Sequence, residues 1–274
     1  MKIKILHEDQ DLLVINKDAG VVVNRAETTP EPTIQDWLAE RQQADDMVKD
    51  WQELVPADFD DSYGSPEEIF QERAGLVHRL DKDTSGVLIL AKNPGALAFL
   101  LKEFKERRTQ KKYVCLTHGN FRVPEGTISA PIERAKVDRQ RMAVGSLGRP
   151  AETQYQVQAF YTGFQDGVEV ELFDKKQQRQ LSIYQGFSLV HCWPKTGRTH
   201  QIRVHMKHWE HPLVGDGKYT GKKRAKLDKV WCPRHFLHAE ELNLTHPRSK
   251  DEVTFTAPLT LDLQKVLDLL KIHS

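Results

Sequence analysis

The sequence has little cysteine and no long apolar run, and both features narrow its class. Its 274 residues include three cysteines, Cys115, Cys192 and Cys232, which are odd in number and far apart. Without a Cys-x-x-Cys pair, they predict reduced, buried thiols rather than a disulfide framework or a zinc ribbon. Apolar runs fall short of the ~18 residues of a membrane span, and the start lacks the apolar stretch of a secretory signal. The expected location is therefore the cytoplasm.

Glycine and proline are scattered rather than clustered. The 16 Gly and 13 Pro, together with 39% hydrophobic and 29% charged residues, exclude collagen-like, coiled-coil and wholly disordered chains. The length exceeds the roughly 100–200 residues of a typical domain, yet one large β-rich domain can accommodate it. We therefore expect a globular protein in which residues 1–274 form a single domain.

The net charge of +1 hides a strong asymmetry. Residues 1–72 hold 6 Lys and Arg against 18 Asp and Glu, whereas residues 73–274 hold 34 against 21. A segment with a net charge of +13 suits a polyanion such as nucleic acid, although basic faces are often simply solvated. The acidic and proline-containing segment at about 42–72 predicts a long surface excursion.

Short apolar runs and turn residues predict more strands than helices. The hairpin-like spacing favours an α+β fold, a mostly antiparallel mixed β-sheet with flanking helices, over a βαβ repeat. Helical spacing and capping residues predict helices at 33–41, 94–108, 199–209 and 261–272. Strands are expected at 3–6, 12–15, 21–23, 76–77, 87–91, 112–117, 151–161, 168–173 and 187–193.

The densest polar run lies between two apolar segments, from Val77 to Val87, and reads VHRLDKDTSGV. A loop between two apolar strands is held rigidly, and this one offers an arginine, two aspartates and a turn-permitting glycine. It is also compatible with a simple hairpin, whose Asp and Ser side chains satisfy their own backbone.

The segment Pro194 to His205 reads PKTGRTHQIRVH. Thr199 can cap a helix there, and a helix start beside Lys195 and Arg198 is a plausible seat for phosphate. The series His205, His208 and His211 invites a metal site, but its spacing is not His-Glu-x-x-His and the cysteines are not spaced as partners. We therefore predict no metal.

Two shorter runs are weaker signals. Tyr113 enters an apolar strand behind two lysines, which is compatible with core packing of its ring. The segment Arg234 to Ala239 couples basic residues to an apolar strand.

Taken together, these runs resemble the pseudouridine synthase family, in the branch of the ribosomal large-subunit and tRNA uridine enzymes. The branch signature His-Arg-Leu-Asp-x-x-Thr-Ser-Gly is matched from His78 to Gly86. The resemblance is dense over about 75–274 and looser over 3–24. Further matches are Lys112-Tyr113, Met142–Val144, Gly148–Thr153, Gly197–His205, Gly215-Asp216 with Tyr219, and Leu237–Ala239.

Two segments depart from the family pattern. The usual Asn-Lys-Pro-x-Gly is Asn16-Lys-Asp-Ala-Gly20, and the usual Arg-Gln before Leu-His-Ala is Arg234-His-Phe. Neither touches the aspartate loop, so they bear on substrate choice more than on activity. The resemblance implies the catalytic domain alone, without the small N-terminal RNA-binding module that many relatives carry.

The resemblance also implies the chemistry and the residues that perform it. Uridine becomes pseudouridine without a change in atoms or redox state, so no cofactor or metal is expected. Asp81 matches the essential aspartate, Arg203 its basic partner, and Tyr113 the tyrosine beside the base. Arg79 matches the arginine that fills the place of the flipped-out nucleotide. Further candidates for binding the substrate are Leu237, beside the base, and His200, Lys82, Arg134, Arg139, Arg141, Lys195 and Arg198, along the RNA backbone.

Three functions remain to be separated. The leading one is isomerisation of uridine in rRNA or tRNA, by a protein expected to act as a monomer. The second is a noncatalytic RNA-binding or ribosome-assembly factor of the same fold, against which the intact Asp81, Arg203 and Tyr113 argue. The third, a metal-dependent nuclease that uses the histidine cluster, would need a bound metal.

Overall fold

The computed structural model describes residues 3–25, 32–42 and 48–273, which pack as two compact units. Unit 1 comprises Met1–Gln110 and Ala239–Pro258, and unit 2 comprises Lys111–His238 and Leu259–Ser274. Unit 1 has 16 Lys and Arg against 26 Asp and Glu, and unit 2 has 24 against 13. The charge asymmetry of the sequence therefore follows the two units. That residues 1–274 act as a single catalytic domain stays a prediction.

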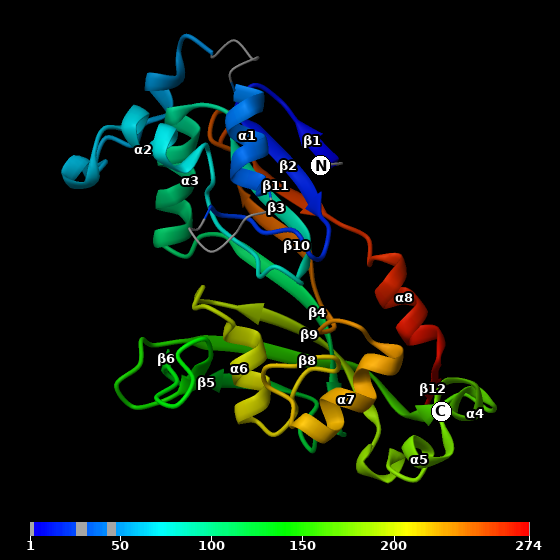
Figure 1. Ribbon diagram of the computed structural model, residues 1–274. Coiled ribbons are helices and arrows are strands. Elements are labelled where there is room, and N and C mark those ends of the chain that lie inside the picture. Colours follow the sequence, from blue (N-terminus) through cyan, green and yellow to red (C-terminus); the bar gives the residue numbers. More distant parts are fainter. Residues whose placement is uncertain (1–2, 26–31, 43–47, 274) are drawn as a thin grey trace. The chain divides into compact units, whose positions relative to one another are not determined.

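Unit 1 is built on a sheet whose strands follow the order β1, β2, β3, β10, with β11 paired to β10 (Figure 1). The register of β1 with β2, of β2 with β3 and of β10 with β11 is antiparallel. Leu12, Val14 and Ile89 place fully buried side chains in the core on this sheet. The strand bounds are Lys4–Glu8 for β1, Leu12–Lys17 for β2, Ser85–Ala91 for β3, Leu237–Thr245 for β10 and Glu252–Thr256 for β11.

The helices of unit 1 are α1 (Ile34–Gln42), α2 (Pro66–Arg73) and α3 (Pro94–Lys105), with short 3-10 turns η1 (Trp51–Leu54) and η2 (Asp61–Tyr63). The Asn93 side chain accepts a hydrogen bond from the Ala96 N–H at 2.8 Å, which caps α3 as the Asn-Pro pair predicts. Helix α3 packs on β3, α2 and η1.

The acidic segment at 42–72 thus contains η1, η2 and most of α2. It buries Trp51, Leu54 and Phe70, so at these points it contributes to the interior of unit 1 and is not wholly a surface excursion. Its residues 43–47 lie outside the described residues.

Unit 2 is built on β4 (Gln110–His118), β9 (Phe187–Pro194) and β8 (Glu152–Phe164), in that order. Beyond β8 the sheet continues with β5 (Glu125–Ser129) along the first half of β8 and β12 (Leu270–Ile272) along its end. All these pairings are antiparallel. A separate hairpin joins β6 (Ile132–Arg134) to β7 (Met142–Val144).

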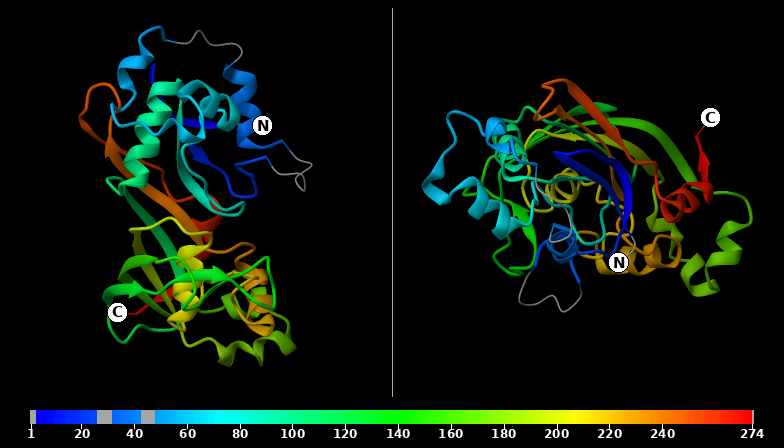
Figure 2. Two further views of the ribbon diagram at one scale, coloured as in Figure 1. Left: turned by 90° about the vertical axis from the view of Figure 1, so that its left-hand side faces the viewer. Right: turned by 90° about the horizontal axis from the view of Figure 1, so that it is seen from above.

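The helices of unit 2 are α4 (Val168–Leu172), α5 (Lys175–Gln178), α6 (Gln201–His208), α7 (Lys222–Trp231) and α8 (Leu261–Asp268), with the 3-10 turn η3 (Leu181–Ile183). Helix α6, drawn in yellow in Figure 2, packs on β7, β8 and β9. An aromatic core surrounds Phe187, whose ring lies 5.1 Å from Trp231 and 6.0 Å from Phe164.

The predicted fold class is confirmed, an α+β protein with a mostly antiparallel sheet and flanking helices. Several local predictions were wrong. Residues 76–77 are not a strand, and Leu76 makes an isolated bridge with Leu90. Residues 21–23 are not a strand, because the carbonyls of Val22 and Val23 accept the N–H groups that begin α1. Residues 168–172 are a helix, because Gly167 starts a turn there and Val168 and Leu172 pack on the same apolar cluster. The last helix ends at Asp268, and β12 follows.

Among the described residues, the helices are too short or too polar to cross a membrane.

Candidate active site

Asp81 lies in unit 1, on the loop that leads into β3. The Thr84 N–H donates to the Asp81 carbonyl at 3.1 Å, which turns the backbone at this point. Gly86 ends the loop with φ +118°, and a Cβ there would lie 2.1 Å from the Ala239 carbonyl oxygen. Only glycine allows this close approach to β10, so the glycine of the motif fixes where the loop joins the sheet.

A buried lysine ties this loop to the end of β2. The Lys17 ammonium donates to the carbonyls of Asp18, Val21 and Lys82 at 2.8, 2.9 and 3.0 Å, and the Gly20 N–H donates to the same Lys82 carbonyl. Lys17 is 0% exposed. A buried ammonium needs hydrogen-bond partners for its three donors, and these carbonyls supply them. The backbone one residue beyond Asp81 is therefore held at a fixed position.

The side chains of this loop differ in exposure. Asp81 is half-buried, whereas Arg79, Lys82 and Asp83 are exposed. His78 stacks on Phe104 with ring centroids 4.9 Å apart and accepts the Ile89 N–H, so the first residue of the motif serves packing.

Arg203 lies in unit 2, on α6, and forms a buried pair with Asp216. Its Nε donates to Asp216 Oδ2 at 2.7 Å and its Nη2 to Asp216 Oδ1 at 2.9 Å. The two residues are 5% and 1% exposed. Burial raises the pKa of Asp216, but the hydrogen bonds and charge of Arg203 outweigh this and leave that pKa below its usual value of 3.8.

Tyr219 joins three elements around Arg203. The Arg203 guanidinium lies 5.1 Å from the centre of the Tyr219 ring. The Tyr219 hydroxyl lies 2.7 Å from His200 Nδ1 and accepts the Met142 N–H at 2.9 Å. This single side chain therefore links α6, the loop after Asp216 and the β6–β7 hairpin.

The start of α6 differs from the prediction. The N-cap position is taken by His200, in the left-handed region at φ +55°, and not by Thr199. Gln201 organises the turn instead, because its Oε1 accepts from Thr196 Oγ1 at 2.6 Å and from Arg198 N at 3.0 Å. A side chain that bonds both flanks of the turn replaces the cap that Thr199 was expected to provide.

Tyr113 and Leu237 share one apolar cluster of unit 2. Leu237 is buried there with Ile202 of α6, and the half-buried Tyr113 packs against the same cluster. Unit 2 therefore brings these two predicted residues near the helix that carries Arg203.

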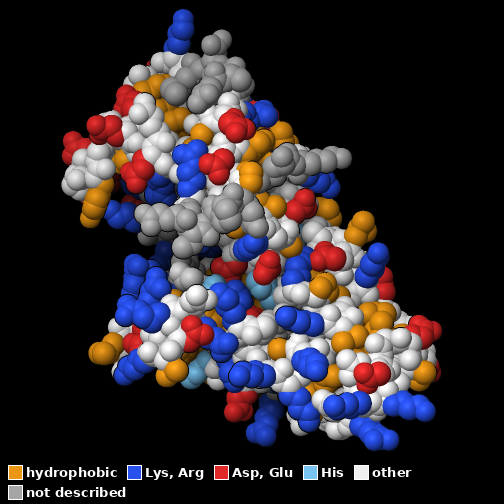
Figure 3. All heavy atoms as spheres, viewed as in Figure 1, with side chains coloured by type: hydrophobic (Ala, Val, Ile, Leu, Met, Phe, Trp, Pro, Cys, Tyr) orange, Lys and Arg blue, Asp and Glu red, His pale blue; other side chains and the backbone are white. Residues whose placement is uncertain are grey.

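The predicted RNA-contacting residues of unit 2 lie on its surface. Arg139 and Arg141, in the β6–β7 connection, are exposed, as is Lys195, whereas Arg198 is half-buried. The Arg141 guanidinium pairs with Asp138 at 3.0 Å, and Arg198 donates its Nε–H to the Pro150 carbonyl at 3.1 Å. Figure 3 shows Lys and Arg side chains, in blue, over much of the visible face of unit 2.

Two of the three histidines considered as metal ligands, His205 and His211, make other contacts. Both ring nitrogens of His205 have partners, Thr153 Oγ1 at 2.9 Å and the Ala130 carbonyl at 3.0 Å. His211 stacks on Phe121 at 3.8 Å and bonds the His118 carbonyl. These contacts explain the two histidines as parts of the core of unit 2.

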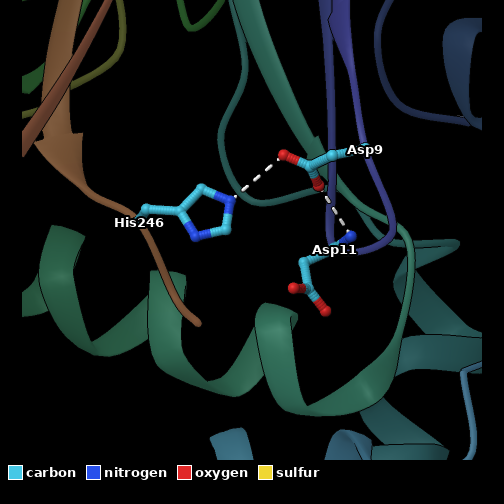
Figure 4. A group of neighbouring side chains, drawn as sticks. All are labelled: Asp9, Asp11 and His246. Carbon is cyan, nitrogen blue, oxygen red and sulfur yellow. Dashed lines mark hydrogen bonds and ion pairs between the residues drawn. The ribbon is translucent and has the colours of Figure 1, made fainter. Parts of the chain in front are cut away.

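Asp9, Asp11 and His246 form a polar cluster in unit 1 (Figure 4). His246 Nε2 lies 3.1 Å from Asp9 Oδ2, and Arg248 donates to both oxygens of Asp11 at 2.7 and 3.1 Å. Histidine and arginine thus already balance the carboxylates, and we interpret the cluster as an ion-pair network.

A cavity of about 490 Å³ in unit 1 does not coincide with the predicted site. Its lining includes Leu13, Arg41, Phe70 and Lys92, and none of the predicted site residues belongs to it. The site prediction therefore rests on the loop and α6, and not on this cavity.

Comparison with known proteins decides the family. The family model for RNA pseudouridylate synthase matches residues 11–208, which is more than half of the chain. The chain belongs to the RNA pseudouridylate synthase family. It is an RNA pseudouridine synthase, an isomerase that acts on uridine in RNA.

Individual relatives agree with this assignment. An uncharacterised RNA pseudouridine synthase of Bacillus subtilis is 35% identical over 99% of this chain and 74% of its own length. Ribosomal large subunit pseudouridine synthase D of Buchnera aphidicola is 35% identical over 96% of this chain and 72% of its own. Among solved structures, human RNA pseudouridylate synthase domain containing 1 has a TM-score of 0.65 and 26% identity, and the match covers 100% of this chain and 89% of that one.

The sequence of this pseudouridine synthase did not indicate that two further residues, Asp216 and Lys17, contact the predicted site residues or their loop. Asp216 holds Arg203, and Lys17 holds the Asp81 loop. Both lie in segments that resemble the family, Gly215-Asp216 and Asn16-Lys17, so the signal was present. Composition and spacing cannot show that either side chain is buried against a predicted site residue.

Proposed function

We propose that this pseudouridine synthase modifies specific uridines in structured RNA, rRNA or tRNA, with Asp81 as the nucleophile on a flipped-out nucleotide. The bond from ribose to the ring nitrogen breaks, and the same uracil rejoins through a ring carbon. A carboxylate that traps or stabilises the separating fragments is the group this chemistry needs. The names of the curated relatives favour large-subunit ribosomal RNA as the substrate.

The observation that carries this proposal is the fixed position of the Asp81 loop. A nucleophile contributes most when it is held in one geometry before the substrate arrives. The Lys17 ammonium and the Gly20 N–H both bond the Lys82 carbonyl, next to Asp81, and Gly86 closes the loop on β10. Asp83, two residues further, is exposed, which supports Asp81 over Asp83 as the reactive carboxylate.

The other roles follow the family resemblance. By that resemblance Arg203 is assigned as the basic partner of the family's essential aspartate, and Tyr113 as the tyrosine that lies against the base and moves the proton from the ring carbon. Arg79 fills the place that the nucleotide leaves, and Leu237 lies beside the base. Extrusion of a nucleotide costs a few kcal/mol, which contacts of this kind repay.

Basic residues of unit 2 bind the RNA backbone in this proposal. Unit 2 has a net charge of +11 and unit 1 a net charge of −10. Contacts to phosphate supply affinity without sequence information, so the choice of uridine depends on other contacts. The side chains assigned to this role are Arg134, Arg139, Arg141, Lys195, Arg198 and His200 in unit 2, and Lys82 in unit 1.

The test compares Asp81→Asn with Asp83→Asn. Each protein is incubated with unmodified large-subunit rRNA and, separately, with tRNA transcripts, and pseudouridine is mapped at nucleotide resolution. We expect wild-type protein and Asp83→Asn to form pseudouridine, and Asp81→Asn to form none while it still binds RNA, because the amide is nearly isosteric but not nucleophilic. Equal loss in both variants, or turnover by Asp81→Asn, would refute the role of Asp81. Wild-type protein that binds RNA without modifying either pool would support a noncatalytic binding factor.

A further inference from the structure

The β6–β7 hairpin of unit 2 has a root and a loop at opposite ends. Its strands pair with Ile132 opposite Val144 at the root, and with Arg134 opposite Met142 beside the loop. At the root, Ile132 exchanges two backbone hydrogen bonds with Arg149, at 2.9 and 3.0 Å, shortly before β8 begins. These bonds join the root to the main sheet of the unit, but the loop lies at the far end of the hairpin.

The loop, residues 135–141, is held in shape by bonds within the hairpin. The Arg141 N–H donates to the Asp138 carbonyl at 2.9 Å, and its guanidinium pairs with the Asp138 carboxylate at 3.0 Å. Arg134 donates to the Arg139 carbonyl at 3.1 Å. Such bonds set the local path of the backbone that carries the two exposed arginines. They do not set the direction of the loop relative to the rest of unit 2.

Tyr219 connects the loop end of the hairpin to helix α6. Its hydroxyl accepts the Met142 N–H, directly after the loop, at 2.9 Å and lies 2.7 Å from Nδ1 of His200, at the start of α6. A phenol hydroxyl has one donor and two acceptor sites, so it can bond both groups at once. The Tyr219 ring is buried, 7% exposed, in a cluster with Val204 of α6. The hydroxyl is therefore presented from a side chain that cannot swing freely.

We propose that Tyr219 is a positioning residue for RNA binding, whose hydroxyl sets the direction of the β6–β7 loop and so of Arg139 and Arg141. The inference rests on the proposed role of these arginines in binding the RNA backbone. A loop whose direction is fixed before RNA arrives loses less conformational entropy when it binds. Without the hydroxyl, the loop keeps its charges and its internal bonds but no longer holds one direction.

The test variant is Tyr219→Phe, which removes the hydroxyl and keeps the ring, 5.1 Å from the Arg203 guanidinium. The net contribution of one intramolecular hydrogen bond corresponds to about 3- to 10-fold in an equilibrium constant. We therefore expect Kd and KM for the unmodified rRNA and tRNA transcripts to rise about 3- to 10-fold. The value of kcat at saturating RNA should stay within about twofold of wild type, because RNA that is already bound holds the loop.

Tyr155→Phe is the matched control. Tyr155 lies on β8 of the same unit, is 4% exposed, and donates its hydroxyl to the Val123 carbonyl at 3.3 Å. This variant also removes one buried hydroxyl that bonds the backbone, but it leaves the hydrogen bond to Met142 in place. Its Kd for RNA should change by less than about 1.5-fold, so a similar small loss of stability, measured by urea unfolding, would not by itself weaken binding.

A double-mutant cycle shows whether Tyr219 acts through the arginines of the loop. Tyr219→Phe is combined with the double variant Arg139→Gln and Arg141→Gln, and Kd is measured for all four proteins. In the background without the arginines, Tyr219→Phe should weaken binding by less than about 1.5-fold, because the charges it positions are gone. The same 3- to 10-fold effect in both backgrounds would show that Tyr219 affects RNA binding by another route and would overturn the inference.

A measurement on the RNA-free protein completes the experiment. Amide hydrogen exchange at Met142 should be about 3- to 10-fold faster in Tyr219→Phe and unchanged in Tyr155→Phe. Unchanged exchange at Met142, or wild-type affinity in Tyr219→Phe, would overturn the inference and leave the proposed function intact. Wild-type affinity in the double arginine variant would refute the proposed role of the loop and the inference with it. If wild-type protein forms no pseudouridine, the proposed activity fails, but the four Kd values still decide the role of Tyr219.

Discussion

At the scale of single residues, the buried ion pair of Arg203 and Asp216 links the activity of a variant to its stability. Asp216 is 1% exposed, and its carboxylate is kept ionised by Arg203 against the effect of burial. Removal of one partner of a buried ion pair leaves the other charged without compensation, which costs about 3–5 kcal/mol. A loss of activity after substitution of Arg203 is therefore interpretable only beside a measurement of stability.

Arg203→Met should destabilise unit 2 most at neutral pH. In the wild-type protein the Asp216 pKa is lowered, so its contribution to stability is present above the unfolded value and lost as the pH falls. In the variant, burial still raises the Asp216 pKa, and only His235 and the backbone N–H groups of the Asp216 loop oppose it. The loss should therefore be about 3–5 kcal/mol at pH 7 and smaller at pH 5, where Asp216 takes up a proton more readily. Urea unfolding at both pH values tests this. The double variant Arg203→Met with Asp216→Asn should be more stable than Arg203→Met at pH 7 and equally inactive, and a loss of stability that does not change with pH would contradict the account.

At the scale of elements, prediction succeeded where one local signal decided the structure. The Asn93-Pro94 pair predicted the start of α3, and the apolar runs beside Glu8–Asp11 predicted β1 and β2. The pattern failed at 168–172, where alternating Val and Glu read as a strand. There Val168 and Leu172 pack inward while Val170 is 74% exposed, so the alternation concealed a helical turn. Whether such a segment forms a helix or a strand depends on the apolar cluster against which it packs, and a local sequence pattern does not reveal that cluster.

For the site, the motif and the fold give different information. Motif resemblance assigns roles to Asp81 and Arg203, because their neighbours in sequence carry the signature, and these roles stay predictions. It did not predict that Lys17 bonds the Lys82 carbonyl across 65 positions, or that Asp216 lies beside Arg203. Long-range partners of this kind depend on the tertiary fold.

The Asp81 loop should lose its fixed position when Lys17 is replaced by methionine. Met keeps most of the apolar stem but leaves the carbonyls of Asp18, Val21 and Lys82 without their common donor. Hydrogen bonds to a charged group contribute about 1.5–3 kcal/mol each, and we expect unit 1 to lose about 3 kcal/mol after partial relaxation. Amide hydrogen exchange should speed up over 78–86, and kcat should fall more than RNA affinity. Lys4→Met, at an exposed lysine, serves as the control. Unchanged amide hydrogen exchange in Lys17→Met would show that the Lys17 hydrogen bonds do not hold the loop.

At the scale of the whole molecule, ionised carboxylates stabilise both units. Burial raises the pKa of Asp9 in unit 1, but hydrogen bonds from His7, His246 and the backbone outweigh it and lower this pKa to about 2. Asp262 of unit 2, also about 2, owes its value to Arg234 and Thr260, which likewise outweigh burial. Groups with lowered pKa values contribute stability above their unfolded value, and the contribution disappears as the pH falls through the folded value.

Acid should therefore destabilise the protein mainly between pH 4 and pH 2, the interval between the ordinary aspartate pKa of 3.8 and the lowered value of about 2. Urea unfolding followed by tryptophan fluorescence at several pH values measures this. Asp9→Asn should be less stable than wild type at pH 6, and the difference should shrink as the pH falls through about 2, because the wild-type carboxylate also becomes neutral there. A difference that stays constant over this range would show that Asp9 contributes through packing rather than charge.

The opposite charges of the two units give the last prediction, which concerns RNA affinity. Unit 2 has a net charge of +11, and its Arg139 and Arg141 are exposed on the β6–β7 connection, whereas unit 1 has a net charge of −10. Each phosphate contact contributes about 0.7–0.9 to the slope of log affinity against log salt. Replacement of Arg139 and Arg141 by Gln should weaken binding to every RNA and reduce that slope by about 1.5. The matched control replaces the exposed Lys4 and Lys49 of unit 1 by Gln, with the same change in net charge, and should leave the slope unaltered. Equal effects of both pairs would mean that overall charge governs affinity, whereas an unchanged slope in the arginine variant would mean that these side chains do not contact phosphate.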